Sequence, residues 1–218
     1  MNSIVVPIYK NWKLCHDLLN SLRKHEKDNI GEVVVVNDCS QDPEVEGGLE
    51  FWRDVKLFPV KIITNEVNVG FTVSSNRGLR EAKHESVFLI SSDVRIGGKF
   101  LEHANSLITP NSFVGHKLLS GSTGWNNFDG KIFPYLEGYF LAAKNFVWED
   151  LGYLDEAYAP WDFEDVDIST TAVSKGYSLV PTNNPAVSHL GGMSIGYSPK
   201  REEITVRNKE YFRRKWLG

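Results

Sequence analysis

The chain is poor in sulfur-containing residues: its 218 residues include two methionines and two cysteines, Cys15 and Cys39. Two cysteines do not make a disulfide framework, and their spacing does not match a metal-binding motif. We therefore expect two reduced thiols, buried or half-buried, as is typical of proteins from a reducing compartment.

Long apolar runs are also missing. No stretch approaches the ~18 consecutive apolar residues that mark a membrane-spanning helix. Residues 1–7 lack the basic start and the long apolar core of a signal peptide, and they predict a strand instead. Together with the reduced cysteines, these absences predict a cytoplasmic protein without a transmembrane segment.

Neither sign of charge dominates the composition. The formal net charge is −4, with 24% charged and 41% hydrophobic residues, as is usual for a globular domain. These totals leave room only for a local basic patch, so we expect no nucleic-acid partner. Internal repeats, low-complexity segments and linkers are absent as well, and a single domain over residues 1–218 is the simplest organisation.

Strands and helices alternate over residues 1–95. The predicted strands are residues 3–8, 32–36, 60–63 and 86–90, and the predicted helices are residues 14–25, 49–55 and 72–83. This alternation predicts an α/β fold with a Rossmann-like, mostly parallel central sheet and helices on both faces. Tyr9, Asp38, Asn65 and Asp93 each follow a predicted strand, at the edge where such sheets bind ligands. We therefore expect residues 1–95 to form a nucleotide-binding half.

Residues 96–218 are less regular, and we expect them to form a small mixed half that completes the site. The predicted helices are residues 100–108, 145–151, 168–175 and 202–216, and the predicted strands are residues 112–118, 135–142, 177–180 and 186–189. A loop or hairpin is expected at residues 120–130 and a mobile segment at residues 191–196.

The most unusual segment is residues 161–167, which carries four carboxylates in seven residues. One interpretation is an acid-rich helix start, because the free N–H groups at a helix N-terminus favour negative charge. The other is catalytic. Trp161 and Phe163 give the acids partly apolar surroundings, which can shift carboxylate pKa values into a range that serves proton transfer.

Six short motifs, in order and spacing, resemble the family 2 glycosyltransferases, which are inverting enzymes of the GT-A fold that use nucleotide-sugar donors. The motifs lie at residues 4–9, at 33–42, at 68–71 with 75–78, at 88–93, at 137–140 with 151–156 and 164–165, and at His189 followed by Gly191, Gly192 and Ser194. The Asn-x-Gly-Phe motif and the single final Asp are similar to rhamnosyltransferase-like members. The resemblance implies one GT-A domain that moves a hexose, such as rhamnose or glucose, from a UDP- or dTDP-sugar to a glycan acceptor.

The resemblance places the nucleotide in the first half. Asp38 would accept a hydrogen bond from the imide N–H of uracil or thymine, and the alternative is a turn residue after a strand. Pro7 and Tyr9 would pack on the base, although strand-end packing explains Tyr9 almost as well. Asn68 and Gly70 open a loop in which glycine permits close backbone approach to a ligand.

The following helix supplies two further donor-binding candidates, Asn76 and Arg77. A guanidinium suits phosphate geometry, so Arg77 would pair with the diphosphate, and a solvated helix arginine is the alternative.

The metal motif departs from the family pattern. The family usually has Asp-x-Asp, and this chain has Ser91-Ser92-Asp93. The resemblance implies that Asp93 and His189 hold Mn²⁺ or Mg²⁺, with the donor diphosphate completing the shell and Ser92 among the donor-binding residues. Hard divalent ions take oxygen ligands and manganese also accepts imidazole, but a lone histidine is more often structural.

The resemblance assigns the general base to Asp165 and places Glu164 on sugar or acceptor hydroxyls. Asp162 and Asp167 are then expected to support the helix start and the structure. Candidate stacking faces for a sugar ring, each also explicable by packing, are Trp125, Tyr139 and Trp161.

The basic C-terminal helix has two interpretations. It covers the site or contacts a charged acceptor through its basic residues, or it packs through Tyr211, Phe212 and Trp216, which we favour.

Two alternatives to a glycosyltransferase remain open. A nucleotidyltransferase shares acids at strand ends but needs a glycine-rich basic loop after the first strand, which residues 7–11 do not provide. A non-catalytic module that binds a sugar nucleotide or a glycan would bind UDP without turnover.

Overall fold

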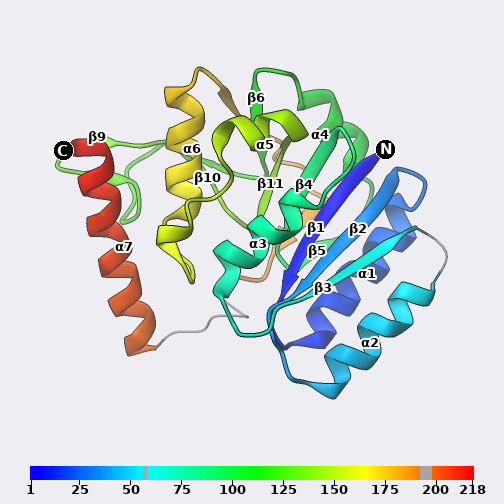
Figure 1. Cartoon of the computed structure of the whole chain (residues 1–218). Coiled ribbons are helices and arrows are strands. Elements are labelled where there is room, and N and C mark those ends of the chain that lie inside the picture. Colours follow the sequence, from blue (N-terminus) through cyan, green and yellow to red (C-terminus); the bar gives the residue numbers. More distant parts are fainter. Residues whose placement is uncertain (56–57, 192–197) are drawn as a thin grey trace.

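A computed structural model describes residues 1–55, 58–191 and 198–218 (Figure 1). Its centre is a seven-stranded sheet with the strand order β12-β6-β11-β4-β1-β2-β3. These strands are β1 (Asn2–Ile8), β2 (Ile30–Asn37), β3 (Val60–Thr64), β4 (Ser86–Ile90), β6 (Ser112–Gly115), β11 (Phe140–Lys144) and β12 (Ser178–Pro181). Strand β11 runs antiparallel to both its neighbours, and the other pairs are parallel. The predicted α/β fold with a mostly parallel sheet is confirmed.

Helices cover both faces of the sheet because successive strand side chains point to opposite sides. One face packs on α1 (Trp12–Glu26), α2 (Pro43–Asp54) and α4 (Leu101–Leu107). The other packs on α3 (Gly70–Arg80), α5 (Asn145–Leu151) and α6 (Glu164–Ser174). In β2, Val33 and Val35 face the first layer and Val34 and Val36 face the second, so all four valines are buried. That explains why this strand is a continuous apolar run.

Three two-stranded ribbons complete the fold at the carboxyl edge. They pair β5 (Val94–Ile96) with β13 (Val187–His189), β7 (Leu118–Leu119) with β10 (Tyr135–Leu136), and β8 (Asn127–Phe128) with β9 (Lys131–Ile132). The last helix, α7 (Pro199–Leu217), lies beside α6 at one end of the molecule (Figure 1). Its Phe212 is fully buried in a separate aromatic cluster with Phe128, Phe133 and Phe163, which confirms the expected packing of this helix.

Several boundaries differ from the sequence predictions. Helix α2 begins at Pro43, six residues before the predicted start at residue 49, and α7 begins at Pro199, three residues before the predicted start at residue 202. The predicted strand at residues 135–142 is two strands, β10 and β11, separated by a turn at residues 137–139. The predicted strand at residues 112–118 likewise divides into β6 and β7. The helix predicted from residue 168 begins at Glu164, so two of the acids lie in its first turn. Most of the segment expected to be mobile, residues 192–196, lies outside the described residues.

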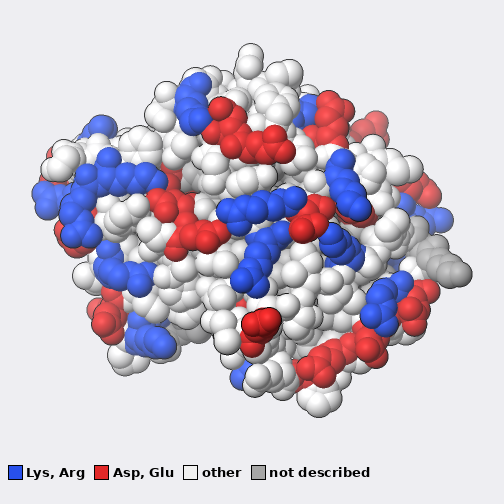
Figure 2. All heavy atoms as spheres, in the orientation of Figure 1, with Lys and Arg blue, Asp and Glu red and all other residues white. Residues whose placement is uncertain are grey.

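Within the described ranges, no helix is both long enough and apolar enough to cross a membrane. On the face shown in Figure 2, lysine and arginine side chains are interspersed with aspartate and glutamate, without a wide patch of one sign.

Candidate active site

A cavity of about 540 Å³ opens at the carboxyl ends of β1, β2 and β4, between the two halves of the chain. Such volumes are typical of small-ligand sites. Thirteen of the fifteen site residues predicted from the sequence line this cavity: Pro7, Tyr9, Asp38, Asn68, Gly70, Ser92, Asp93, Trp125, Tyr139, Trp161, Glu164, Asp165 and His189. The structure therefore brings together residues that lie up to 182 positions apart in the sequence.

Asp38 holds the loop that precedes α3. It is buried, and its carboxylate accepts hydrogen bonds from the backbone N–H groups of Val69 (2.9 Å) and Gly70 (2.8 Å) and from the Asn65 amide (2.8 Å). This loop therefore keeps its shape through Asp38. Asp38 also lines the cavity, and recognition of a base there remains a prediction.

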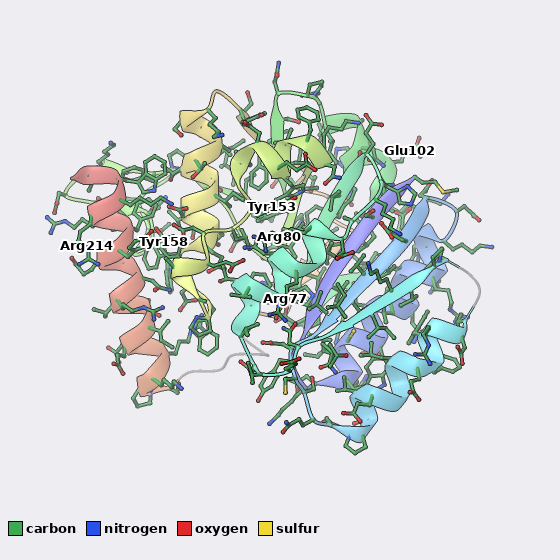
Figure 3. All side chains as sticks on the ribbon, viewed as in Figure 1. Arg77, Arg80, Glu102, Tyr153, Tyr158 and Arg214 are labelled. Carbon is green, nitrogen blue, oxygen red and sulfur yellow. The ribbon has the colours of Figure 1, made fainter. Side chains whose placement is uncertain are left out.

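Asn76 and Arg77 do not line the cavity. Asn76 is fully buried on α3, where its amide donates to the Leu154 carbonyl (2.7 Å) and its oxygen accepts from the Leu154 N–H (3.0 Å). Arg77 lies exposed on α3 (Figure 3), and its guanidinium donates to the Asn65 side-chain oxygen at 2.6 Å. In this structure, both residues hold neighbouring segments in place.

Asp93 and His189 lie in contact although 96 positions separate them. His189 Nε2 is 3.1 Å from Asp93 Oδ1, because β13 pairs with β5 directly after Asp93. Ser91, at the first position of the Asp-x-Asp motif, donates its hydroxyl to the same Asp93 oxygen (2.7 Å). Burial raises the pKa of Asp93, but the hydrogen bonds from His189 and Ser91 outweigh it and leave the pKa below its ordinary value. The carboxylate is therefore ionised at neutral pH.

Glu164 and Asp165 begin α6 and face the same cavity. Asp165 accepts hydrogen bonds from the N–H groups of Val166 (2.8 Å) and Gly138 (3.0 Å), the latter from the turn between β10 and β11. Glu164 is 7% exposed, and its Oε2 is buried without a hydrogen-bond partner among the described residues. An unsatisfied buried oxygen is costly, so this atom is well placed to bind a polar ligand group.

Burial is the main cause of the pKa shifts of this pair. It raises the pKa of Asp165 to about 6, although the two N–H donors act in the opposite direction. It also raises the pKa of Glu164 well above its usual range, with the charge of Asp165 adding to the effect. At neutral pH Asp165 is mostly ionised, and the upward pKa shift of Glu164 favours its protonated form. The pair therefore combines a proton acceptor with a side chain whose environment favours hydrogen-bond donation.

The other two acids of the segment anchor α7. Asp162 forms an ion pair with Arg201 (3.0 Å) and accepts from the Thr205 hydroxyl (2.6 Å). Asp167 is buried and accepts from Lys215 (2.8 Å) and from the Trp216 indole (2.7 Å). Both acids thus have the structural role expected for them.

Aromatic rings close the cavity on the side of the second half. Trp125 is 39% exposed and packs against Phe163 with ring centroids 5.5 Å apart. Trp161 Nε1 is buried without a hydrogen-bond partner among the described residues, so it offers a donor to a ligand. Tyr139 stacks on His189 at 4.2 Å between centroids. All three rings line the cavity, and sugar stacking on them remains a prediction.

Several lining residues were not predicted from the sequence. They are Ile8, Phe71, Ser74, Ser91, Tyr135, Glu137, Gly138, Asp162, Phe163 and Arg201. Of these, Gly138 and Arg201 matter most, because they bind Asp165 and Asp162 respectively. Half of the residues in this list lie inside the motifs that carry the resemblance, so the sequence could have indicated them. They are Ile8, Phe71, Ser91, Glu137 and Gly138.

Comparison with known proteins identifies the family. The family model described as Glycosyl transferase family 2 matches residues 3–149. The chain belongs to this family. Among relatives, an uncharacterized glycosyltransferase of Haemophilus influenzae is 34% identical over 93 residues, which are 43% of this chain and 29% of that protein. The poly(ribitol-phosphate) beta-N-acetylglucosaminyltransferase TarS of Staphylococcus aureus is 33% identical over 107 residues, 49% of this chain and 18% of TarS. The chain spans less than a third of either relative.

Solved structures of other glycosyltransferases share the fold. S. aureus TarS 1–349 in complex with UDP-GlcNAc superposes with a TM-score of 0.66 and 23% identity, covering 93% of this chain and 64% of that one. The Pyrobaculum calidifontis mannosyltransferase PcManGT, in complex with GDP-Man and Mn²⁺, gives a TM-score of 0.67 at 17% identity, covering 96% and 69%. GalNAc-T7 with UDP, GalNAc and Mn²⁺ gives a TM-score of 0.75 at 15% identity, and the match covers 96% of this chain and 47% of GalNAc-T7. These likenesses confirm the predicted GT-A fold.

Proposed function

We propose that this family 2 chain is an inverting hexosyltransferase, which moves a sugar such as rhamnose or glucose from a UDP- or dTDP-linked donor to a hydroxyl of a glycan acceptor. Residues 1–95 would bind the nucleotide, and residues 96–218 would supply the acceptor side and the base. One observation carries the proposal: Glu164 and Asp165, two carboxyl groups with raised pKa values, line the same cavity as the Asp93–His189 pair. Relatives that bind UDP-GlcNAc or GDP-Man support a nucleotide-sugar donor.

The reaction would be a single displacement. Asp165 removes the proton from the acceptor hydroxyl while the oxygen of this hydroxyl attacks the anomeric carbon of the donor sugar. The bond from that carbon to the diphosphate oxygen breaks, the nucleoside diphosphate leaves, and the carbon inverts. Glu164, whose raised pKa favours the protonated form, would donate a hydrogen bond to a sugar hydroxyl, and the buried Trp161 N–H offers a second donor. Trp125, Tyr139 and Trp161 would contact the sugar rings.

Asp93 and His189 would hold the metal, Mn²⁺ or Mg²⁺. Their donor set, one carboxylate oxygen and one imidazole nitrogen 3.1 Å apart, fits a divalent ion and suits manganese better than magnesium. No group of three or more His, Cys, Asp or Glu side chains in the described residues is placed to hold a metal. The donor diphosphate would therefore provide further ligands. A bound ion would neutralise the negative charge of the leaving diphosphate.

We expect Mn²⁺ to bind more tightly with UDP present than without it. The protein supplies two of the ligands, and the diphosphate of UDP would supply others. Isothermal titration with Mn²⁺ in the presence and absence of UDP measures this difference. His189→Ala should weaken Mn²⁺ binding by at least about tenfold, as the loss of an essential ligand contact does. His25→Ala, a histidine on α1 outside the cavity, is the matched control. Equal Mn²⁺ affinity in His189→Ala and wild type would exclude His189 as a ligand.

The rate should depend on pH through Asp165. Because the base must be ionised, kcat/KM, which reports the pKa values of the free enzyme, should fall as the pH drops through about 6, where Asp165 takes up its proton. The negative charge of Glu137 contributes to the raised pKa of Asp165, so Glu137→Gln should move this acid limb to lower pH. A pH–rate profile of both enzymes measures the shift. An acid limb that moves to higher pH in Glu137→Gln would contradict the assignment.

A donor screen tests the proposal as a whole. Thermal shift with Mn²⁺ and a set of UDP- and dTDP-sugars should show stabilisation by at least one of them, and that donor should be hydrolysed or transferred. Tight UDP binding with no turnover on any acceptor would instead support the non-catalytic binding module. The nucleotidyltransferase alternative loses its basis, because the family model covers both the first strand and the metal motif.

A further inference from the structure

Behind His189 lies a buried pair, His116 and Tyr139, whose polar atoms the proposed reaction does not use. His116 follows β6 and is 4% exposed. Its Nδ1 lies 2.6 Å from the Tyr139 hydroxyl, and its Nε2 lies 3.1 Å from the backbone carbonyl oxygen of Asn184. Both ring nitrogens are therefore occupied by fixed partners on other segments of the fold.

The hydrogen-bond partners define the tautomer of His116. The Asn184 carbonyl can only accept, so the proton of His116 is on Nε2. Burial lowers the pKa of His116, which keeps the ring neutral and leaves Nδ1 as an acceptor. The Tyr139 hydroxyl consequently donates to Nδ1. The phenol ring is held at its outer end.

The Tyr139 ring in turn supports His189. The two rings are 4.2 Å apart between centroids and 19° from parallel, and His189 Nε2 faces Asp93 at 3.1 Å. A second hollow of about 500 Å³ is lined by His116, Tyr139 and His189. The His189 side chain is 27% exposed, so open space adjoins it, and the stacked ring restricts its rotation.

We propose that His116 is a positioning residue: it fixes the Tyr139 ring by a hydrogen bond, and this ring holds the His189 imidazole in the orientation that binds the divalent ion beside Asp93. The inference rests on the proposed metal role of Asp93 and His189. It adds two residues, 73 and 50 positions before His189, to the support of the metal site.

The test is the dissociation constant of Mn²⁺ with UDP present, measured on the 218-residue chain by the electron paramagnetic resonance of free Mn²⁺. Tyr139→Phe keeps the ring and removes the hydroxyl, and His116→Leu removes the acceptor. Each should raise this constant about tenfold, the lower end of the effect of outer-shell partners on metal affinity. The double variant should be no weaker than the worse single one, because both changes break the same hydrogen bond.

Two variants separate positioning from general loss of structure. His116→Asn places an amide oxygen near the position of Nδ1 and should recover most of the affinity that His116→Leu loses. Tyr177→Phe removes a hydroxyl that binds Asp150 on the surface, and it should bind Mn²⁺ as wild type does. Melting temperatures are recorded in parallel. A metal affinity that follows the melting temperature across all variants, without recovery in His116→Asn, would overturn the inference.

The outcomes also distinguish this inference from the proposed function. If His189→Ala binds Mn²⁺ as wild type does, the metal assignment fails and the inference fails with it. If His189→Ala loses Mn²⁺ while Tyr139→Phe and His116→Leu bind it within about twofold of wild type, the inference alone is wrong.

Discussion

Asp165→Asn should lower kcat by about 10²–10⁴-fold, the range that general-base catalysis contributes, and should leave donor binding nearly unchanged. The asparagine side chain is nearly the same size, but it cannot take a proton. Its single oxygen can accept from Gly138 or from Val166, which donate to different oxygens of the carboxylate, so one of the two hydrogen bonds is lost. Steady-state kinetics with the donor found in the screen, together with UDP titration, measure both quantities. The matched control is Asp150→Asn, an exposed aspartate bound to Lys175 and Tyr177, which should retain full activity.

Asp165→Asn should affect the stability of the fold differently from kcat. The pKa of Asp165 is higher in the folded state than in an unfolded chain, so the folded protein binds this proton more tightly. The stability that proton binding by Asp165 contributes is therefore fully present below the unfolded pKa near 3.8. It is lost as the pH rises through the folded pKa of about 6. Near pH 7 the ionised carboxylate destabilises the fold. Its replacement by a neutral amide removes this cost and offsets the lost hydrogen bond, so the melting temperature should change little. A large fall in both kcat and melting temperature would point to structural damage instead of loss of the base.

The sequence predicts the fold well where local and global signals agree. Buried strands such as residues 32–36 are apolar on both faces. The polar residues that follow these strands indicate the ligand-binding edge of the sheet, even when the order of the strands is unknown. The order of the motifs also predicts that Asp93 and His189 act together, and the structure shows these two side chains in contact. The acid-rich helix start and the catalytic interpretation of residues 161–167 also prove compatible, because Glu164 and Asp165 belong to the first turn of α6 and face the cavity.

Contacts that depend on tertiary packing were beyond the sequence. Asn76 and Arg77 lie on a predicted helix, but only the packing against Leu154 decides that Asn76 points away from the cavity. The strand predicted over residues 135–142 hides the turn that brings the Gly138 N–H to Asp165. The sequence predicts that α7 packs through its aromatic residues, but not that it holds the acidic segment. Asn208 of α7 donates to the carbonyls of both Tyr158 and Asp162, which lie 46 or more positions away in the sequence. The acidic segment keeps its shape through this helix.

The other large effect is expected at Gly70, where the two halves of the chain meet. Its φ is +86°, and a Cβ atom there would lie 2.2 Å from the Cβ and 2.4 Å from the Cα of Pro160. Gly70→Ala should therefore lower the free energy of unfolding by about 2–5 kcal/mol, through a strained left-handed residue and a forced backbone shift. Thermal and urea unfolding measure this loss.

The shift should also reach the site, because Gly70 is tied to both sides of the cavity. Its N–H binds Asp38, and the Pro160 that an added methyl group would displace directly precedes Trp161. UDP affinity should fall together with stability. Gly47→Ala, in α2 with no atom within 4 Å of the added Cβ, is the control and should stabilise the chain by about 0.5–1 kcal/mol, because alanine favours a helix over glycine. If Gly70→Ala instead matched Gly47→Ala in stability and UDP binding, the close approach of α3 to residues 160–161 would not exist in solution.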